Sequence, residues 1–223
     1  SGKTALIGAL VLVFLVGPEA RQNSQIVSGA RSRKQASLVF KLASKMIRLN
    51  PDLQAVARII PSGSKLIGLP MNVEYEAISA EAGTAHGLSP YLAILDELGQ
   101  VKGEHDDFVE AIVTAQGAYD DAIKIVISTQ AATDADLLSV WIDDARNSAD
   151  PKIICHVYEA SPEAELTDPE AWKAANPALG VFRSMVDMQA WAEKAARASS
   201  EESGFRNLGL NQRVNRFDPF ISK

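Results

Sequence analysis

The sequence predicts an α/β domain in which helices cover both faces of a mostly parallel β-sheet. Short β-prone runs alternate with helical stretches across residues 25–158. The run Ile123–Ile127 is β-branched at all but one position, which is typical of a strand buried on both faces of a parallel sheet. With 223 residues, 47% of them hydrophobic, the chain can bury a sizeable core. Together these features indicate a three-layer arrangement.

The individual elements follow from periodicity and from breaker residues. A helix is expected to end at Asn50-Pro51, because the residue before a proline disfavours helical backbone. Pro61, Ser62-Gly63 and Pro70 separate three short strands. Strands are expected at 25–28, 56–60, 65–68, 76–79, 91–95, 123–127 and 153–158, and helices at 34–49, 108–116 and 135–145.

The composition changes near Ala160, where glutamate, alanine and tryptophan become frequent. Helices are expected to start at Asp168-Pro169-Glu170 and near Ser184, and the helical region to end near Ser203. The sequence therefore predicts a core over residues 1–159 and a small helical part over residues 160–223.

The charge and cysteine content limit the function classes. The formal net charge is -6 and the pI is about 5.1, which argues against a general basic face for nucleic acid but leaves open a local basic patch. Cys155 is the sole cysteine, so no intrachain disulfide can form. The three histidines lie far apart in the sequence, and no structural metal site is expected.

The N-terminal run at residues 5–16 is almost wholly apolar and follows Lys3. It has the composition of a signal peptide, but it equally suits a buried helix, and it is too short to span a bilayer. The residues directly before it favour the buried helix. Gly2-Lys3-Thr4 is the end of a phosphate-binding loop, in which backbone N–H groups, a lysine and a hydroxyl meet phosphates and Mg²⁺ at a helix N-terminus.

Two strand ends add to this phosphate-binding pattern. The apolar run at 91–95 ends in Asp96-Glu97. In ATPases of the P-loop class, an aspartate at such a strand end holds Mg²⁺, and the adjacent glutamate acts as general base on the attacking water. The alternative for this pair is a solvated acidic turn. The strand at 123–127 runs into Ser128-Thr129-Gln130, whose side chains could sense the γ-phosphate, or simply form a polar turn. The three segments in this order predict a nucleotide site.

Several of these segments resemble phage terminase large subunits. The resemblance is carried by residues 81–90 leading into 91–97, by Gln35-Ala36 after a strand-to-helix turn, and by Ser128-Thr129-Gln130. It continues through residues 172–180, Phe205-Arg206 and residues 210–212, and so covers nearly the whole chain.

The resemblance implies a P-loop NTPase of the RecA-like, additional-strand, catalytic-glutamate type with a helical lid, which hydrolyses ATP to move double-stranded DNA into a capsid. Gly2, Lys3 and Thr4 would bind the nucleotide, Thr4 and Asp96 would hold Mg²⁺, and Glu97 would be catalytic. Ser128, Thr129 and Gln130 would couple hydrolysis to lid movement. The implied partners are viral DNA, the portal protein and a small terminase subunit. The implied setting is a ring of identical subunits in the host cytoplasm, without membrane or secretion.

The chain departs from the family pattern at both ends. The front of the phosphate loop and the adenine-contacting segment are expected before Ser1, and the C-terminal nuclease after Lys223, so no nuclease residues are assigned. An arginine finger is also expected, for which the candidates are Arg31, Arg33, Arg58 and Arg146. The alternatives to an ATP-driven packaging motor are another P-loop translocase or helicase, a non-catalytic prophage remnant, and a secreted protein.

Overall fold

The computed structural model describes residues 2–82 and 87–214 and divides the chain into two compact units. Unit 1 contains Ser1–Glu97 and Asp106–Ile127; unit 2 contains Leu98–His105 and Ser128–Lys223. The division along the chain falls after Ile127, whereas composition placed the start of the helical part near residue 160. The functional boundary of the lid stays a prediction.

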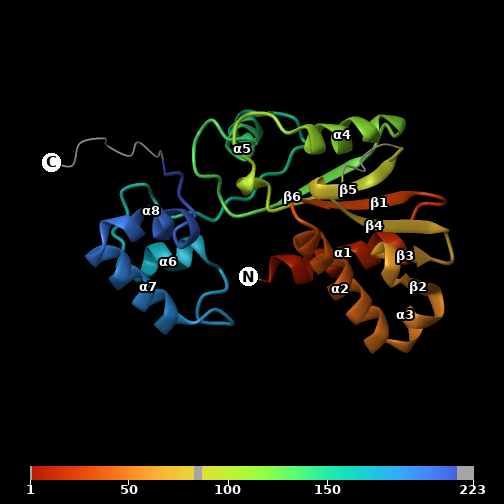
Figure 1. Ribbon diagram of the computed structural model, residues 1–223, viewed down its shortest axis with the longest axis horizontal. Coiled ribbons are helices and arrows are strands. Elements are labelled where there is room, and N and C mark those ends of the chain that lie inside the picture. The colour runs from red at the N-terminus through yellow and green to blue at the C-terminus, as the bar shows by residue number, and fades with distance from the viewer. Residues whose placement is uncertain (1, 83–86, 215–223) are drawn as a thin grey trace. The chain divides into compact units, whose positions relative to one another are not determined.

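Unit 1 is built on a six-stranded sheet with the order β2-β3-β4-β1-β5-β6 (Figure 1). Strands β4, β1, β5 and β6 run parallel, and β3 pairs antiparallel with both β2 and β4. The sheet is therefore mostly parallel, as predicted. The strands are β1 Gln25–Ala30, β2 Ala57–Ile60, β3 Lys65–Gly68, β4 Val73–Ser79, β5 Pro90–Asp96 and β6 Ile123–Ile127.

Helices cover both faces of this sheet, which confirms the three-layer prediction. Figure 1 shows α4 on one face, above the sheet, and α1 and α2 on the other. The helices of unit 1 are α1 Lys3–Leu15, α2 Arg33–Leu49, α3 Pro51–Val56 and α4 Asp107–Ala115, with single 3₁₀ turns at Pro61–Gly63, Ala80–Ala82 and Gln116–Ala118.

Helix α1 is the buried helix expected from the apolar N-terminal run. Val11 and Leu15 are fully buried in the main core of unit 1, and α1 packs on α2 and on the sheet. Its first turns are more open, since Leu6 is 70% exposed. Among the described helices, none has both the length and the apolar character needed to cross a bilayer.

Helix α2 begins and ends through side-chain caps that the sequence supplies. The Ser32 hydroxyl accepts a hydrogen bond from the Gln35 backbone N–H, and the Gln35 side chain accepts one from the Ser32 N–H in return. The helix ends at Asn50, whose side-chain oxygen caps α3 in turn. The predicted boundaries of this helix are thus confirmed to within one residue at its start.

Three strand predictions need correction. Strand β6 is only partly buried, because it has β5 as its one neighbour in the described sheet and so forms an edge. Residues 153–158 form no strand in the described structure: Ile154 is 79% exposed, and β-branched residues need a neighbouring strand to pair with. Strand β4 begins at Val73, three residues before the predicted start.

Unit 2 contains the helices α5 Leu137–Asn147, α6 Pro169–Ala175, α7 Met185–Arg197 and α8 Ser199–Leu208, with a single 3₁₀ turn at Leu98–Gln100. The last three of these helices pack around a small core of their own. In this core the indole N–H of Trp172 donates to the Leu166 carbonyl at 2.7 Å, and Trp191 stacks edge-on against Phe205. The expected helical region therefore forms, and it continues to Leu208 instead of ending near Ser203.

We predict that Gly68→Ala destabilises unit 1. A β-carbon at Gly68 would overlap the carbonyl oxygen of Leu15 at the end of α1, so the helix would have to shift away from β3. Overpacking of this kind costs about 1–3 kcal/mol, measurable as a lower urea midpoint. The matched control is Gly117→Ala, because a β-carbon there meets no atom within 4 Å. Equal midpoints for the two variants would contradict the prediction.

Asp136→Ala is expected to destabilise unit 2. The buried Asp136 carboxylate accepts hydrogen bonds from the backbone N–H groups of Gly103 at 3.0 Å and Thr133 at 2.9 Å. Burial alone would raise the pKa of Asp136, but these donors more than offset it and hold the pKa below its ordinary value. Its stabilisation is therefore present at neutral pH and is lost as pH falls through the folded-state pKa.

Removal of the carboxylate should cost about 1–3 kcal/mol at neutral pH, with the loss shrinking in acid. Hydrogen exchange of unit 2 amides at two pH values would measure this difference. Asp144→Ala provides the control, because Asp144 lies exposed on the same segment of the chain within α5. A loss for Asp136→Ala no larger than for Asp144→Ala would show that the two hydrogen bonds contribute little.

Candidate functional site

The parallel strands of unit 1 bring the predicted acidic pair to one edge of the sheet. Asp96 is the last residue of β5 and lies opposite Ile127, the last residue of β6. The Glu97 backbone N–H then donates to the Ile127 carbonyl oxygen at 2.9 Å, which continues the ladder by one bond. Ligand sites of parallel sheets lie at this carboxyl edge.

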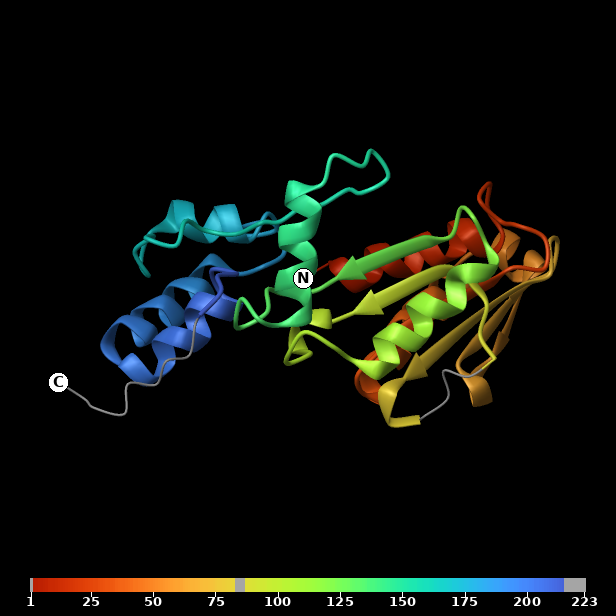
Figure 2. The same ribbon diagram turned by 90° about the horizontal axis from the view of Figure 1, so that it is seen from above.

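Lys3 and Asp96 lie close enough to influence each other electrostatically. Burial raises the pKa of Asp96, the charge of Glu97 raises it further, and the Lys3 ammonium partly offsets this rise. In Figure 2 the red helix α1 begins at the edge toward which the arrowheads of β5 and β6 point. The structure thus brings together two motifs that lie more than ninety residues apart in the sequence.

Among the described residues, no side chain caps the N-terminus of α1. The N-cap position is occupied by Gly2, which is exposed and has no side chain with which to cap the helix. Lys3 and Thr4 are half-buried. The first backbone N–H groups of a helix have no partner inside the helix, and they carry the positive end of its dipole. Together with the Lys3 ammonium they form an environment suited to anionic oxygens.

Glu97 has a left-handed backbone conformation, with φ of 57°. Residues other than glycine rarely adopt this region, and strained backbone of this kind clusters at functional sites. The hydrogen bond to Ile127 holds the strained residue in place. The strand therefore ends sharply at the acidic pair, and the direction in which the chain leaves the sheet is fixed there.

A buried hydroxyl pair lies near this acidic pair. Tyr75 on β4 is fully buried, and its hydroxyl lies 2.7 Å from the Ser28 hydroxyl on β1. Burial raises the pKa of Tyr75, the Ser28 hydrogen bond opposes the rise, and the Asp96 charge adds to it. Sequence reasoning missed this pair, because nothing in the two separate strands indicates that the side chains meet.

In unit 2, residues 128–130 pack closely against the chain that follows the acidic pair in sequence. The Ser128 hydroxyl accepts a hydrogen bond from the Gly99 N–H at 2.7 Å. A β-carbon at Gly99 would overlap the Thr129 carbonyl oxygen, so only glycine fits there. In the sequence, the position of this glycine two residues after Glu97 is the signal that indicates close packing here.

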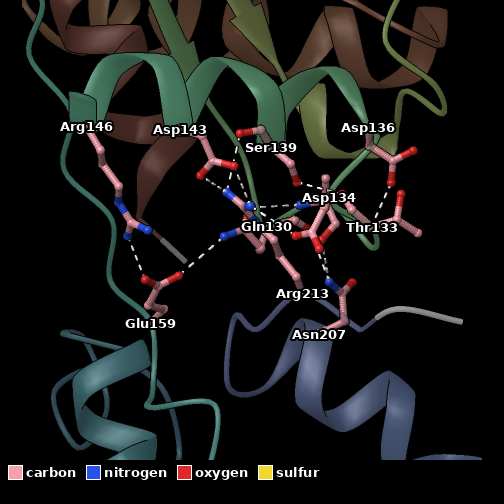
Figure 3. A network of polar contacts seen from close by, with 11 residues as sticks. Gln130, Thr133, Asp134, Asp136, Ser139, Asp143, Arg146, Glu159, Asn207 and Arg213 are labelled. Atoms are coloured by element: carbon pink, nitrogen blue, oxygen red, sulfur yellow. Dashed lines mark hydrogen bonds and ion pairs between the residues drawn. The ribbon is translucent and has the colours of Figure 1, made fainter. Parts of the chain in front are cut away.

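Gln130 is 3% exposed and forms the centre of a polar network (Figure 3). Its backbone N–H donates to the Asn211 side-chain oxygen at 2.7 Å, and its carbonyl oxygen accepts from the Asn207 amide at 3.2 Å. Its own amide donates to Glu159 at 3.3 Å. The residue is thus bound to α8, to the segment after α8 and to the segment before α6.

The same network extends to α5 through two arginines. Arg146 pairs with Glu159 at 2.6 Å, and Arg213 pairs with Asp143 at 2.6 Å and Asp134 at 3.1 Å. Figure 3 shows these side chains converging from α5, from residues 130–136 and from the C-terminal segment. The sequence could not reveal this convergence, because its members come from widely separated segments.

Two of the four arginine-finger candidates form ion pairs with carboxylates. Arg31 pairs with Asp106 at 2.6 Å, and Arg146 is held by Glu159 as described. Both guanidinium groups are therefore already occupied within their own units. Arg33 and Arg58 are exposed. His86 and the rest of residues 83–86, which contribute to the family resemblance, lie outside the described residues.

The chain is similar over its whole length to known terminase large subunits. A family described as "Terminase large subunit, ATPase domain" matches residues 1–149. The chain is 64% identical to the "Terminase, large subunit" of Enterobacteria phage HK97 over 223 residues, which is 100% of the chain and 44% of that protein. The crystal structure of the HK97 bacteriophage large terminase matches with a TM-score of 0.93 and 65% identity, covering 99% of this chain and 46% of that one.

A more distant match shows the fold alone. The large terminase ATPase domain of Thermus phage P74-26 aligns with a TM-score of 0.59 and 17% identity, covering 94% of this chain and 84% of that domain. The chain spans less than half the length of its HK97 relative. The family match nevertheless covers well over half of the chain, and this chain belongs to the family of terminase large subunit ATPase domains.

Proposed function

We propose that the chain hydrolyses ATP and that hydrolysis drives the packaging of double-stranded DNA into a phage capsid. The observation that carries this proposal is the placement of Lys3, at the start of α1, beside the Asp96-Glu97 pair at the carboxyl edge of the sheet. Membership of the terminase ATPase family supports the same reaction and the same substrate class.

Gly2, Lys3 and Thr4 are proposed to bind the nucleotide phosphates. The uncapped helix N-terminus and the Lys3 ammonium both favour negative charge. The Thr4 hydroxyl and the Asp96 carboxylate are oxygen ligands, the type that Mg²⁺ prefers, and Asp96 is a buried carboxylate next to a second acid. These residues therefore fit Mg²⁺, which when bound would neutralise charge on the phosphate oxygens.

Glu97 is proposed to act as the general base. A carboxylate in this position orients a water molecule and accepts its proton as the water attacks the terminal phosphate. The strained backbone of Glu97 and its hydrogen bond to Ile127 support this role, because they fix where the side chain leaves the main chain. Asp96, being buried, is better suited to hold a cation than to exchange protons with solvent.

Ser128, Thr129 and Gln130 are proposed to couple hydrolysis to movement of a lid formed by residues 160–223. Gly99, two residues after Glu97 in the sequence, packs directly on Ser128 and Thr129. Gln130 is in turn tied to Asn207 and Asn211 in the helical region. A shift at the acidic pair would therefore have a short covalent and hydrogen-bonded route to the helices of unit 2.

The proposed partners follow from the family. They are viral double-stranded DNA, the portal protein, a small terminase subunit and further copies of the chain arranged in a ring, in the cytoplasm of the bacterial host.

Glu97→Gln should reduce ATP turnover by at least about a hundredfold, because an amide cannot accept the proton of the attacking water. Nucleotide affinity, measured by equilibrium binding, should stay close to that of the unmodified protein, since the change keeps the size and backbone conformation of the residue. Glu19→Gln, at an exposed position in the loop after α1, is the control and should turn over normally. Undiminished turnover in Glu97→Gln would refute the role given to Glu97.

Asn211→Gly should uncouple hydrolysis from packaging. The change removes the acceptor for the Gln130 N–H, a bond worth about 1 kcal/mol, while glycine still tolerates the φ of 55° at this position. We expect ATP turnover to persist while the number of base pairs packaged per ATP falls several-fold. Asn211→Asp keeps the acceptor and should retain coupling. Equal packaging yields per ATP for the two variants would contradict the route through Gln130.

A further inference from the structure

Helix α2 carries a row of cations along its exposed side. Lys34, Lys41, Lys45 and Arg48 are all exposed. At 3.6 residues per turn, these four residues lie within about 60° of one another around the helix, and they extend over about 21 Å of its length. We call these four residues the α2 row; Leu38, also exposed, lies on the same side. The α2 sequence contains no acidic residue.

The core fixes the direction in which the α2 row faces. Ala36, Val39, Phe40, Ala43 and Ile47 are buried and belong to the opposite side of the helix, which packs on α1 and on the sheet. Because the apolar side is already covered by unit 1, α2 has no free apolar face with which to enter a membrane surface. The polar side is the one left for a partner.

The cations of the α2 row are not neutralised within the described structure. None of the four side chains forms an ion pair or hydrogen bond with a residue in the ranges 2–82 and 87–214. Many other cations of the chain do: Arg21, Arg31, Lys65, Arg146, Arg206 and Arg213 each contact a carboxylate. In a chain of net charge -6, a row of four unpaired cations is a local exception.

We propose that the α2 row binds the phosphate backbone of double-stranded DNA. Its length corresponds to about six base pairs of duplex, at 3.4 Å per base pair, so several phosphates lie within its reach. Lysines act as mobile point charges and contact phosphates without reading sequence, as a protein that moves along DNA requires. This inference rests on the proposed packaging function, and it assigns to that function a DNA-contacting surface.

The test is the salt dependence of DNA binding by the full chain. In the variant K34Q/K41Q/K45Q/R48Q, glutamine keeps the helix propensity and removes the charges. Each phosphate contact contributes about 0.9 to the slope of log affinity against log salt concentration. For a short duplex of mixed sequence, we expect a slope flatter by about 2–4 and an affinity at least about tenfold lower at low salt. Single changes at Lys41 or Lys45 should each flatten the slope by about 1.

A charge-matched control separates the α2 row from net charge. K152Q/K173Q/K194Q/R197Q removes four cations from exposed positions of unit 2 and should leave the slope unchanged. The variant K34R/K41R/K45R keeps the charges and should bind normally. The proposal is overturned if the α2 glutamine variant keeps the wild-type salt slope, or if both glutamine variants lose DNA affinity equally. It is also overturned if polyglutamate competes for binding to the α2 row as effectively as duplex DNA does.

ATP turnover without DNA distinguishes this proposal from the proposed function. The variant K34Q/K41Q/K45Q/R48Q should hydrolyse ATP at the wild-type rate, because none of the four substituted residues belongs to the proposed nucleotide site. Normal ATP turnover together with an unchanged salt dependence of DNA affinity would contradict only the proposal that the α2 row binds DNA. Absence of turnover in the wild-type chain would count against the ATPase proposal, while the salt slope would still decide whether the α2 row binds DNA.

Discussion

The parallel pairing of β1, β5 and β6 is the constraint on which the proposed nucleotide site depends. Because these strands run in one direction, their carboxyl ends meet at one edge, and the register of β5 against β6 sets Asp96 opposite Ile127. The extra hydrogen bond from Glu97 to Ile127 then lets a residue with strained backbone end the strand. A shift of one residue in this register would turn Asp96 toward the other face of the sheet.

Burial gives the acidic pair its chemical character. Asp96 is buried beside Glu97, and both burial and the neighbouring charge raise the pKa of Asp96, while the Lys3 ammonium and a hydrogen bond from the Glu97 backbone oppose the rise. Such an arrangement is poorly stabilised by the protein alone and is improved by a cation. The proposed Mg²⁺ would therefore stabilise this site when bound, which links the electrostatics of the fold to the proposed reaction.

In unit 2, a buried polar residue is held by hydrogen bonds to other segments of the chain. Gln130 is buried, yet its main chain and its side chain are each bonded to side chains from other segments, so the cost of burying them is offset. Because these bonds involve α8 and the segment that follows it, the conformation of residues 128–130 is set jointly with that of the helical region.

The sequence by itself determined most of the strands that carry apolar runs and clear breakers, the end of α2 at Asn50-Pro51, and the residues of the predicted nucleotide motif. These depend on local chemistry: Asn50-Pro51 ends a helix in almost any setting, and Gly2-Lys3-Thr4 has its meaning from residue type and spacing. Only the tertiary structure decided that β6 lies at an edge of the described sheet and that residues 153–158 form no strand. It also decided that Gly99, Tyr75 and Asn211 contact Ser128, Ser28 and Gln130 respectively. Each of these depends on which distant segment lies alongside, and hydrogen-bond pairing and close packing are properties of neighbours in space that no local pattern records.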